Sequence, residues 1–517
     1  MANRPPAVHH LLFAAFPVLF LYSHNIGALS LKVLPAPLIV SVCSAAAFFL
    51  LLNLYVKNGE KTALVISLFL LAFFSYGRSL ALFTVLAAIF VAGSYMLVRT
   101  RRDLAGPTYL CNTMAAILVL ISMANICRYE AGRAIRHGGN AAPVDALTAA
   151  PAREARAGRP DIYYIVVDAY AGDDILREVY GYDNSGFTSY LESKGFYVAS
   201  EAVSNYSRTG LSLASSLNME YLDTPLAEID RFSNDMMPLA EIVKQNRVFD
   251  FLRRRGYTIA ALESGCAESG MDSADIYLKP GWAPDEFGNM LIGTTPIPLL
   301  LRILGTPDQY DAHADRILFE FRRLADTSML RRPLFIFAHI AVPHPPFVFG
   351  PDGQRLKPGL IFHVEDGDSL IRKGRLTKER YIRGYVDQLI FTNMKLRKVI
   401  DAILSGSKRP AIIILQSDHG PRSMLSWKDP SKTNFRECMS ILNAYRLPDG
   451  GDKLLYKGMT PVNTFRAVFD YYFGTDYGLL EDRSYFSDEK YPYKFVDVTP
   501  SLLKTTIPKG GRVSDRE

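Results

Sequence analysis

Residues 383–420, RGYVDQLIFTNMKLRKVIDAILSGSKRPAIIILQSDHG, contain the pattern that decides the fold. The first two thirds predict a long amphipathic helix, because apolar residues recur at helical spacing. A Gly/Pro break at SGSKRP follows. The run AIIILQ then predicts a buried strand, and the polar residues Asp418 and His419 come directly after it.

The same alternation of helix and strand patterns extends from about residue 161 to the end of the chain. Buried strands are predicted in DIYYIVVDAY (161–170) and RPLFIFAHIAVPH (332–344), and VFDFLRRRGYTIAALE (248–263) predicts a helix, a glycine turn and a strand. In GMTPVNTFRAVFDYYFG (458–474), Thr460 is the predicted cap, Pro461 the first helical residue and Gly474 the stop. This alternation predicts an α/β sandwich with a mostly parallel central sheet. Ligands of such sheets bind at the carboxyl ends of the strands.

The first 130 residues have a different composition. Five apolar segments, at about 10–29, 33–56, 62–77, 80–98 and 108–127, mostly reach the roughly 20 residues that a bilayer span needs. They predict an α-helical membrane domain of five spans over 1–130. A cleaved signal peptide is the alternative for the first segment, but it lacks a convincing cleavage site and four more apolar segments follow.

Basic residues predict the orientation of these spans. A cytoplasmic N-terminus leaves only Lys32 and Arg78 in the outer loops and places everything after Tyr129 outside the cytoplasm. Three basic residues after the last span would lie outside in this orientation and oppose the excess of positive charge inside, unless they meet anionic headgroups on the outer face. They are Arg128, Arg133 and Arg136. The inner stretches then hold Arg4, Lys57, Lys61, Arg99, Arg101 and Arg102.

The remaining bulk features limit the functional class. Residues 131–160 are rich in Ala, Pro and Gly and predict a flexible linker before an extracytoplasmic domain over 161–517. The net charge of +6 sits largely in loops between apolar runs, which favours membrane topology over nucleic-acid binding. Five cysteines imply no disulfide framework, although one bridge is compatible with the count, and no zinc-ribbon spacing is present.

Several predicted strands end in groups suited to metal chemistry. Asp168 follows IYYIVV, Asp418 and His419 follow the strand at 411–416, and the strand around 334–340 carries His339 and leads to His344. Carboxylates and imidazoles together bind divalent metals. Each group also has a structural interpretation: Asp168 as a helix cap, Asp-His-Gly as an ordinary turn, His339 as a core histidine and His344 as exposed on a rigid proline turn.

The stretch SNYSRTGLSLASSLNM (204–219) predicts a loop that runs into a helix and is crowded with hydroxyl groups. Thr209 stands at the predicted helix start, where a hydroxyl usually caps backbone N–H groups. A nucleophile at the same place would gain from a bound cation and from the N–H groups of the helix N-terminus. Ser207 and Ser212 are the alternative hydroxyls.

The order VVD, NYSRTGLSLASSL, FAHIAVPHPPF and QSDHG resembles the alkaline phosphatase/sulfatase superfamily. More narrowly, with the apolar N-terminal part, it is similar to membrane-anchored phosphoethanolamine transferases and lipoteichoic-acid-synthase-like phosphoglycerol transferases. The resemblance implies that Thr209 is the nucleophile and that it binds one divalent metal together with Asp168, Asp418 and His419. It also implies that His339 and His344 contact the donor or a second metal. Zn²⁺ suits imidazole with carboxylates, and Mn²⁺ or Mg²⁺ would also fit.

Two features depart from these families. The run TGLSL lacks the C/S-x-P-x-R motif of sulfatases that carry formylglycine, which argues against that class. No histidine follows Asp-His-Gly closely, where phosphoethanolamine transferases often carry one. Arg422 or Lys428 is the candidate contact for the donor phosphate, since guanidinium geometry suits phosphate, and a solvated surface charge is the alternative for both.

The expected function is therefore a metal-dependent transferase. It would move a phospholipid headgroup phosphate, of the phosphoethanolamine or phosphoglycerol type, through a covalent threonine intermediate to an extracytoplasmic glycan or lipid acceptor. The expected location is a bacterial-type inner membrane with the C-terminal domain on the periplasmic side. A membrane-anchored hydrolase of phosphate or sulfate esters would use the same site. A non-catalytic binding protein with a decayed fold is the third hypothesis, and the presence of Asp168, Thr209, Asp418 and His419 together argues against it.

Overall fold

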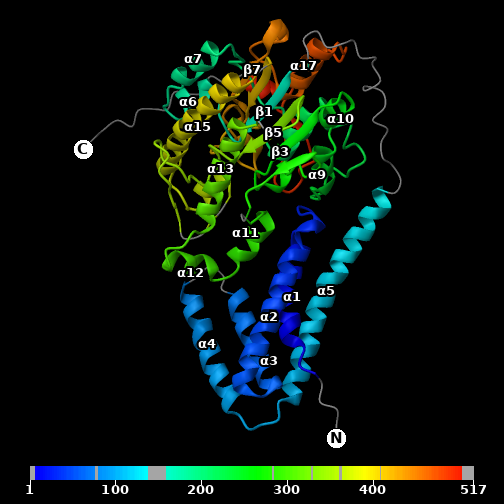
Figure 1. Cartoon of the computed structure of the whole chain (residues 1–517), viewed down its shortest axis with the longest axis vertical. Coiled ribbons are helices and arrows are strands. Elements are labelled where there is room, and N and C mark those ends of the chain that lie inside the picture. The colour runs from blue at the N-terminus through cyan, green and yellow to red at the C-terminus, as the bar shows by residue number, and fades with distance from the viewer. Residues whose placement is uncertain are drawn as a thin grey trace, which may run out of the picture.

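The computed structural model describes residues 6–75, 80–137, 159–281, 284–327, 330–359, 362, 364–407 and 409–503. An N-terminal helical region lies below an α/β domain that contains the remaining elements (Figure 1). Residues 138–158, most of the predicted linker, lie outside the described residues, as do Arg4 and Arg78. The last helix of the helical region continues to His137 and therefore passes the predicted domain end at residue 130.

The described part of the helical region contains five α-helices, one for each predicted apolar segment. They are α1 (His9–His24), α2 (Pro35–Val56), α3 (Gly59–Phe74), α4 (Leu80–Arg99) and α5 (Ala105–His137). Three stretches of the described chain are long and apolar enough to cross a membrane: Leu31–Val56, Leu82–Arg99 and Ala105–Ala134. Helices α1 and α3 have 16 residues each, fewer than the roughly 20 that a straight span needs.

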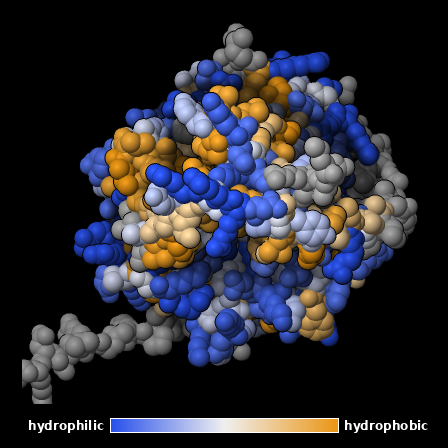
Figure 2. Space-filling view, turned by 90° about the horizontal axis from the view of Figure 1, so that it is seen from below, coloured by the Kyte–Doolittle hydropathy of each residue, from blue (hydrophilic) through white to orange (hydrophobic). Residues whose placement is uncertain are grey.

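Basic residues gather at the end of the helical region that faces away from the α/β domain. Lys57 and Lys61 stand at the turn between α2 and α3, and Arg99, Arg101 and Arg102 stand at the turn between α4 and α5. Both turns lie at the lower end of the molecule (Figure 1). Figure 2 views the molecule from this end, where strongly hydrophilic residues lie beside hydrophobic ones. This distribution agrees with the loop charges expected for a membrane protein.

The α/β domain is built on a seven-stranded sheet in the order β2-β7-β6-β1-β5-β3-β4. Strands β6, β1, β5, β3 and β4 are parallel to one another, and β7 is antiparallel to both β6 and β2. The predicted mostly parallel sheet is therefore confirmed. Its strands are β1 (Asp161–Val167), β2 (Tyr197–Val198), β3 (Thr258–Leu262), β4 (Ile276–Leu278), β5 (Leu334–Ile340), β6 (Ala411–Gln416) and β7 (Asn443–Arg446).

Helices cover both faces of this sheet, because its central strands are apolar on both sides. On one face, side chains such as Ile165, Ala338 and Leu415 pack against α6 (Asp173–Glu178), α7 (Ser185–Ser193), α13 (Gln309–Ala325), α14 (Gly367–Arg372) and α15 (Lys378–Gly406). On the other face, Val166, Phe337 and Ile414 pack against α8 (Thr209–Asn218), α9 (Met237–Lys244), α10 (Arg247–Arg254) and α17 (Thr464–Phe473). Figure 1 shows α13 and α15 on one side of the sheet and α9 and α10 on the other.

The opening stretch folds as predicted, with α15 as the long helix and β6 as the buried strand. The segment around Thr460 differs in detail. Pro461–Asn463 form a single 3-10 turn, α17 begins only at Thr464, and Gly474 ends it in the left-handed conformation with φ 64°. Four further helices are α11 (Glu286–Gly293), α12 (Ile297–Ile303), α16 (Phe435–Met439) and α18 (Thr499–Leu503), and strands β8 (Tyr485–Phe486) and β9 (Val496–Asp497) form a separate pair.

Polar contacts connect the helical region to the α/β domain. Tyr129 Oη donates to Asp235 Oδ1 at 2.6 Å, and the Lys32 ammonium lies 3.0 Å from Asp272. Arg133 forms ion pairs with Glu241 and Glu130, so protein carboxylates meet its charge, and its side chain remains 26% exposed. Arg128 is exposed, and the side chain of Arg136 lies outside the described part of the chain.

Candidate active site at the carboxyl ends of β1, β5 and β6

The candidate metal ligands meet because three neighbouring strands share one register. Val166 of β1 lies opposite His339 of β5 and Gln416 of β6, so Asp168 and Asp418 each stand two residues beyond paired positions. Side chains alternate between the two faces of a sheet. Asp168, His339 and Asp418 therefore continue the face that α8 covers, and Thr209 at the start of α8 can reach them.

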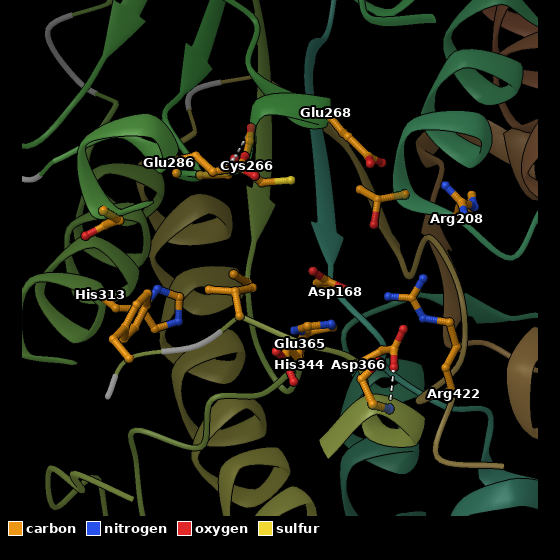
Figure 3. Close-up of a pocket in the computed structure, with 18 of the residues that line it drawn as sticks. Asp168, Arg208, Cys266, Glu268, Glu286, His313, His344, Glu365, Asp366 and Arg422 are labelled. Atoms are coloured by element: carbon orange, nitrogen blue, oxygen red, sulfur yellow. Dashed lines mark hydrogen bonds between the residues drawn. The ribbon is translucent and has the colours of Figure 1, made fainter. Parts of the chain in front are cut away.

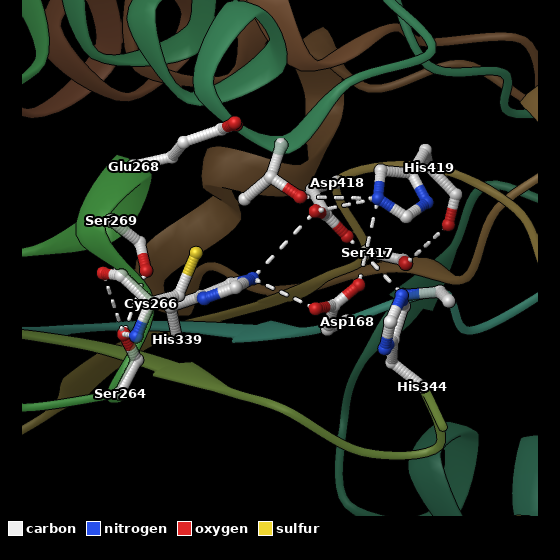
Figure 4. A network of polar contacts seen from close by, with 12 residues as sticks. Asp168, Ser264, Cys266, Glu268, Ser269, His339, His344, Ser417, Asp418 and His419 are labelled. Atoms are coloured by element: carbon white, nitrogen blue, oxygen red, sulfur yellow. Dashed lines mark hydrogen bonds and ion pairs between the residues drawn. The ribbon is translucent and has the colours of Figure 1, made fainter. Parts of the chain in front are cut away.

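These side chains form a tight buried group. His339 Nε2 lies 3.8 Å from Asp168 Oδ2 and 3.6 Å from Asp418 Oδ2. His419 Nε2 lies 3.5 Å from Asp168 Oδ1 and 3.2 Å from Asp418 Oδ2. In Figure 4 the ring of His339 and the ring of His419 lie on opposite sides of the two carboxylates. His339, which the resemblance assigned to the donor or a second metal, thus lies among the expected ligands of the first.

The chemistry of this group fits a divalent cation. Asp168, His339 and Asp418 offer ligand atoms that lie within 4.8 Å of one another. Asp168 Oδ1, Asp418 Oδ2 and both ring nitrogens of His339 are buried without a hydrogen-bond partner. Buried polar atoms normally have partners, and a cation would supply one for the carboxylates and for one imidazole nitrogen. Two carboxylates, two imidazoles and a hydroxyl form a donor set that suits Zn²⁺ or Mn²⁺.

The charges within the group act on one another. Burial would raise the pKa of Asp418, but the adjacent His419 and His339 hold it well below its ordinary value. Burial would lower the pKa of His339, yet Asp418 and Asp168 raise it above the ordinary value of histidine. Burial and the nearby Arg422 lower the pKa of His419. These shifts favour an ionised Asp418 and a neutral His419, the forms that bind metals, and a proton on His339 that a bound cation would displace.

Backbone carbonyls fix the tautomers of His419 and His344. His419 Nδ1 lies 2.8 Å from the carbonyl oxygen of Gly420, and His344 Nδ1 lies 2.5 Å from that of Pro345. A carbonyl only accepts, so each Nδ1 carries a proton and donates it. In the neutral form of either ring, the Nε2 atom keeps its lone pair. For His419 that atom faces Thr209 and the carboxylates, and His344 lines the cavity described below.

Thr209 is the first helical residue of α8, and Arg208 is the N-cap residue. The interpretation of Thr209 as a capping residue is therefore wrong. Its hydroxyl lies 3.1 Å from His419 Nε2. Ser207 and Ser212 are also buried, but Thr209 is the hydroxyl of this stretch that lines the cavity. The hydroxyl of Thr209 is therefore in position to act as a nucleophile beside the candidate metal ligands.

The N-terminus of α8 is less open to an anion than the sequence predicts. The Gly210 backbone N–H donates to Glu268 Oε2 at 2.8 Å, so a carboxylate of the protein takes one of the first free N–H groups. Glu268 lies in the 3-10 turn Ala267–Ser269 and also lines the cavity. Positive charge next to Thr209 comes mainly from side chains.

Two arginines provide that charge, of which Arg422 is buried and Arg208 is partly buried. Arg208 lies 4.7 Å and Arg422 lies 5.8 Å from the ring centre of Trp427, so both guanidinium groups face one indole. Arg422 Nη1 donates to the carbonyl of Ser207 at 3.1 Å, and Arg208 Nη2 donates to that of Asp488 at 3.1 Å. The Nε atoms of both arginines are buried without a partner. Burial lowers the pKa of Arg208. Such a pair suits a phosphate oxyanion, which guanidinium groups bind in a fixed geometry.

A cavity of about 550 Å³ lies between Asp168, Thr209 and the two arginines. Figure 3 shows Arg208 and Arg422 on one side of it, with Glu286 and His313 on the opposite side and Asp168 and His344 between them. Its volume is typical of small-ligand sites. The charged and titratable lining residues are Asp168, Arg208, Cys266, Glu268, Glu286, His313, Arg316, His344, Glu365, Asp366, Lys373, Arg422 and Glu489.

Sequence reasoning located some of these residues and missed others. Arg422 is buried and lines the cavity, so the surface-charge interpretation is wrong for it, whereas Lys428 is exposed. Arg208 was missed, although its position next to Thr209 is a usable signal. Glu268 and Trp427 carry no sequence signal, since they lie in irregular segments that only tertiary packing brings to the cavity.

Known structures resemble this fold at low sequence identity. The integral membrane lipooligosaccharide phosphoethanolamine transferase A of Neisseria meningitidis is 12% identical, with 90% of this chain and 95% of that chain covered and a TM-score of 0.41. The C-terminal periplasmic domain of EcEptC from Escherichia coli is 12% identical, with 67% and 96% covered and a TM-score of 0.40. The phosphonate monoester hydrolase of Agrobacterium radiobacter is 13% identical, with 63% and 80% covered and a TM-score of 0.39.

Family membership rests on the sequence match. No curated protein is significantly similar in sequence to the chain. The sulfatase family model matches residues 160–468, more than half of the 517 residues. The matched segment contains Asp168, Thr209, His339, His344, Asp418, His419 and Arg422. The chain therefore belongs to the sulfatase family.

Proposed function

We propose that the protein is a metal-dependent transferase that moves the phosphorylated headgroup of a membrane phospholipid onto Thr209 and then onto a glycan or lipid acceptor outside the cytoplasm. The observation that carries the proposal is the position of Thr209. Its hydroxyl contacts His419 beside the buried carboxylates, in a cavity that also holds two arginines with unpartnered Nε atoms. The candidate nucleophile, the candidate metal ligands and the candidate phosphate contacts therefore lie next to one another.

Asp168, His339, Asp418 and His419 would hold the cation together with Thr209. A divalent cation bound there lowers the pKa of the threonine hydroxyl and neutralises charge on the phosphoryl group. Arg208 and Arg422 bind the non-bridging phosphate oxygens and orient the phosphorus toward Thr209. The burial of this end of the cavity strengthens each of these charge interactions.

The proposed transfer has two steps, and His344 moves a proton in both. In the first, the Thr209 hydroxyl gives its proton to solvent water and its oxygen bonds to phosphorus, while the bond from phosphorus to the diacylglycerol oxygen breaks. Protonated His344 gives its Nε2 proton to that leaving oxygen. In the second, the acceptor hydroxyl oxygen bonds to phosphorus and gives its proton to His344, while the bond from phosphorus to the Thr209 oxygen breaks and that oxygen takes a proton from solvent water.

The membrane anchoring supports a lipid donor. The proposal includes five spans, of which α1 and α3 are short, an N-terminus in the cytoplasm and the α/β domain outside a bacterial-type inner membrane. Basic residues at the lower turns of the helical region support this orientation. An enzyme fixed to its membrane by helices beside its cavity meets a lipid donor at high local concentration.

The test compares Thr209→Ala with Thr209→Ser in the full chain, reconstituted in vesicles of phosphatidylethanolamine and phosphatidylglycerol. We expect Thr209→Ala to abolish diacylglycerol release and Thr209→Ser to retain a fraction of it, because serine keeps the hydroxyl. Mass spectrometry of the peptide that contains residues 204–219 should show a headgroup-phosphate adduct on Thr209 in the wild type. Diacylglycerol release that survives Thr209→Ala would overturn the nucleophile assignment.

The products distinguish the transferase from the hydrolase alternative. A transferase releases diacylglycerol in step with headgroup phosphate bound to an added acceptor, whereas a hydrolase releases free headgroup phosphate at the same rate. Metal removal by a chelator should stop both reactions, and Zn²⁺ or Mn²⁺ should restore them.

A further inference from the structure

Helix α11 has two faces that serve different parts of the molecule. Glu286, Asn289 and Met290 line the cavity that holds Thr209. Phe287 and Leu291, one turn apart, belong instead to an apolar cluster with the helical region. Residues three or four positions apart share a face of a helix, so α11 separates the cavity from the helical region by its own width.

The second face of α11 packs on α1 and shares an apolar cluster with two candidate membrane spans. Phe287 is buried in one cluster with Leu34, which lies near the start of the candidate span Leu31–Val56, and with Val119 and Ile126 of the candidate span Ala105–Ala134. The ring of Phe287 also packs edge-to-face on Tyr22 of α1, with centroids 6.1 Å apart. One wall of the cavity therefore stands at the boundary between the bilayer and the α/β domain.

Helix α12 follows at the same level and exposes apolar side chains. Leu300 is 44% exposed, Ile303 71% and Leu304 72%, and their spacing places them on one face. Arg302 points back toward the α/β domain, where it donates to the carbonyl of Gly359. Figure 1 shows α12 between the α/β domain and the upper ends of α2 and α4. An apolar face at this level is suited to contact with lipid.

From this arrangement we propose that the segment 286–304, made of α11 and α12, rests on the outer leaflet and guides the phospholipid headgroup into the cavity. Leu300, Ile303 and Leu304 insert among the acyl chains. The headgroup enters along Glu286, Asn289 and Met290, while its acyl chains stay in the bilayer. This inference rests on the proposed function for the identity of the ligand, but the insertion of α12 does not depend on turnover.

The first experiment measures insertion without any activity. Ile303→Trp and Leu479→Trp are compared in the full chain, reconstituted in vesicles whose acyl chains carry bromine, a quencher of tryptophan fluorescence. Leu479 is a matched control: it is 43% exposed and follows α17, which lies at the far end of the α/β domain from the helical region. The background is low because the native chain has two tryptophans.

We expect the added tryptophan at position 303 to lose more than about half of its fluorescence relative to unbrominated vesicles, and the one at position 479 to lose almost none. Equal quenching at the two positions would overturn the insertion of α12.

The second experiment tests guidance. The triple variant Leu300→Ser, Ile303→Ser and Leu304→Ser is assayed on donor lipid in vesicles and on a short-chain donor that stays monomeric in solution. We expect about a tenfold loss of diacylglycerol release from vesicles and little change with the monomeric donor. Leu479→Ser should change neither rate.

Three outcomes of the second experiment are distinct. A triple variant that matches the wild type on vesicles would overturn the inference. An equal loss on both donors would also overturn it, because the segment would then serve only the structure of the domain. A wild type that releases diacylglycerol from neither donor would overturn the proposed function, while the quenching result would still decide whether α12 inserts.

Discussion

Among the residues that the structure describes, two clusters of buried charge contain carboxylates without hydrogen-bond partners. One is the candidate site, where Asp168 and Asp418 meet histidines at the carboxyl ends of three strands. The other lies around α13, where both carboxylate oxygens of Glu320 lack a partner. Near it, Arg316 Nε lies 3.7 Å from Glu263 Oε2. Burial and unpaired atoms alone do not separate the two.

The two clusters differ in the surroundings of their unpartnered polar atoms. In the site, unpartnered atoms from β1, β5 and β6 converge on one another, and Asp168 also lines the cavity beside Thr209. Glu320 lies one helical turn after Arg316 on the same helix; Arg316 reaches the cavity, but the carboxylate of Glu320 does not line it. Convergence of several elements on an accessible space, rather than buried charge, therefore identifies the place for chemistry.

The largest expected effect comes from Asp418→Asn. The amide is a poor metal ligand, and it removes the charge that holds the two histidines near each other. We expect loss of the bound metal and a fall of about 10³-fold or more in turnover. Elemental analysis of the purified full chain and diacylglycerol release measure the two effects. Glu320→Gln is the matched control from the second cluster and should keep both metal and turnover. If Asp418→Asn retained its metal, the ligand assignment would fail.

A smaller effect is expected from Arg208→Met, which keeps much of the side-chain volume but removes the guanidinium. We expect kcat/KM to fall about 10- to 100-fold and inhibition by inorganic phosphate to weaken, because charge-assisted bonds to the phosphate oxygens are lost. Arg208→Lys should recover only part of the loss. Arg255→Met is the control, since Arg255 also packs over an aromatic ring, that of Phe251, away from the cavity. Equal losses in Arg208→Met and Arg255→Met would exclude a phosphate contact.

The sequence predicted the parts of this comparison that follow from strand periodicity. Buried runs such as DIYYIVV and AIIILQ define strands and their ends, so Asp168, Asp418 and His419 could be expected together. The register that brings His339 level with Val166 depends on how the strands pair, which the periodicity does not specify. The same holds for Arg208 and Arg422 at Trp427, because contacts between loops depend on tertiary packing.

The second cluster could not be predicted because Glu320 lies on an amphipathic helix, where charged residues normally face solvent. Its burial has a measurable consequence. Burial raises the pKa of Glu320 well above its ordinary value, so the folded state holds the carboxyl proton more tightly than the unfolded state does. The stability that this proton supplies is complete below the ordinary pKa of glutamate, and it is lost as pH rises through the raised pKa of the folded protein.

Glu320→Gln removes this titration and nearly preserves the shape of the side chain. We expect the variant and the wild type to have similar melting temperatures in detergent at pH 5. At pH 8 the variant should be more stable by about 1 kcal/mol or more, since each unit of pKa shift corresponds to about 1.4 kcal/mol. A difference between the two proteins that stayed constant from pH 5 to pH 8 would show that Glu320 does not titrate in this way. This smallest effect sharpens the comparison between the two clusters. It would show that the cluster around Glu320 affects the stability of the fold, whereas the cluster around Asp168 and Asp418 is required for turnover.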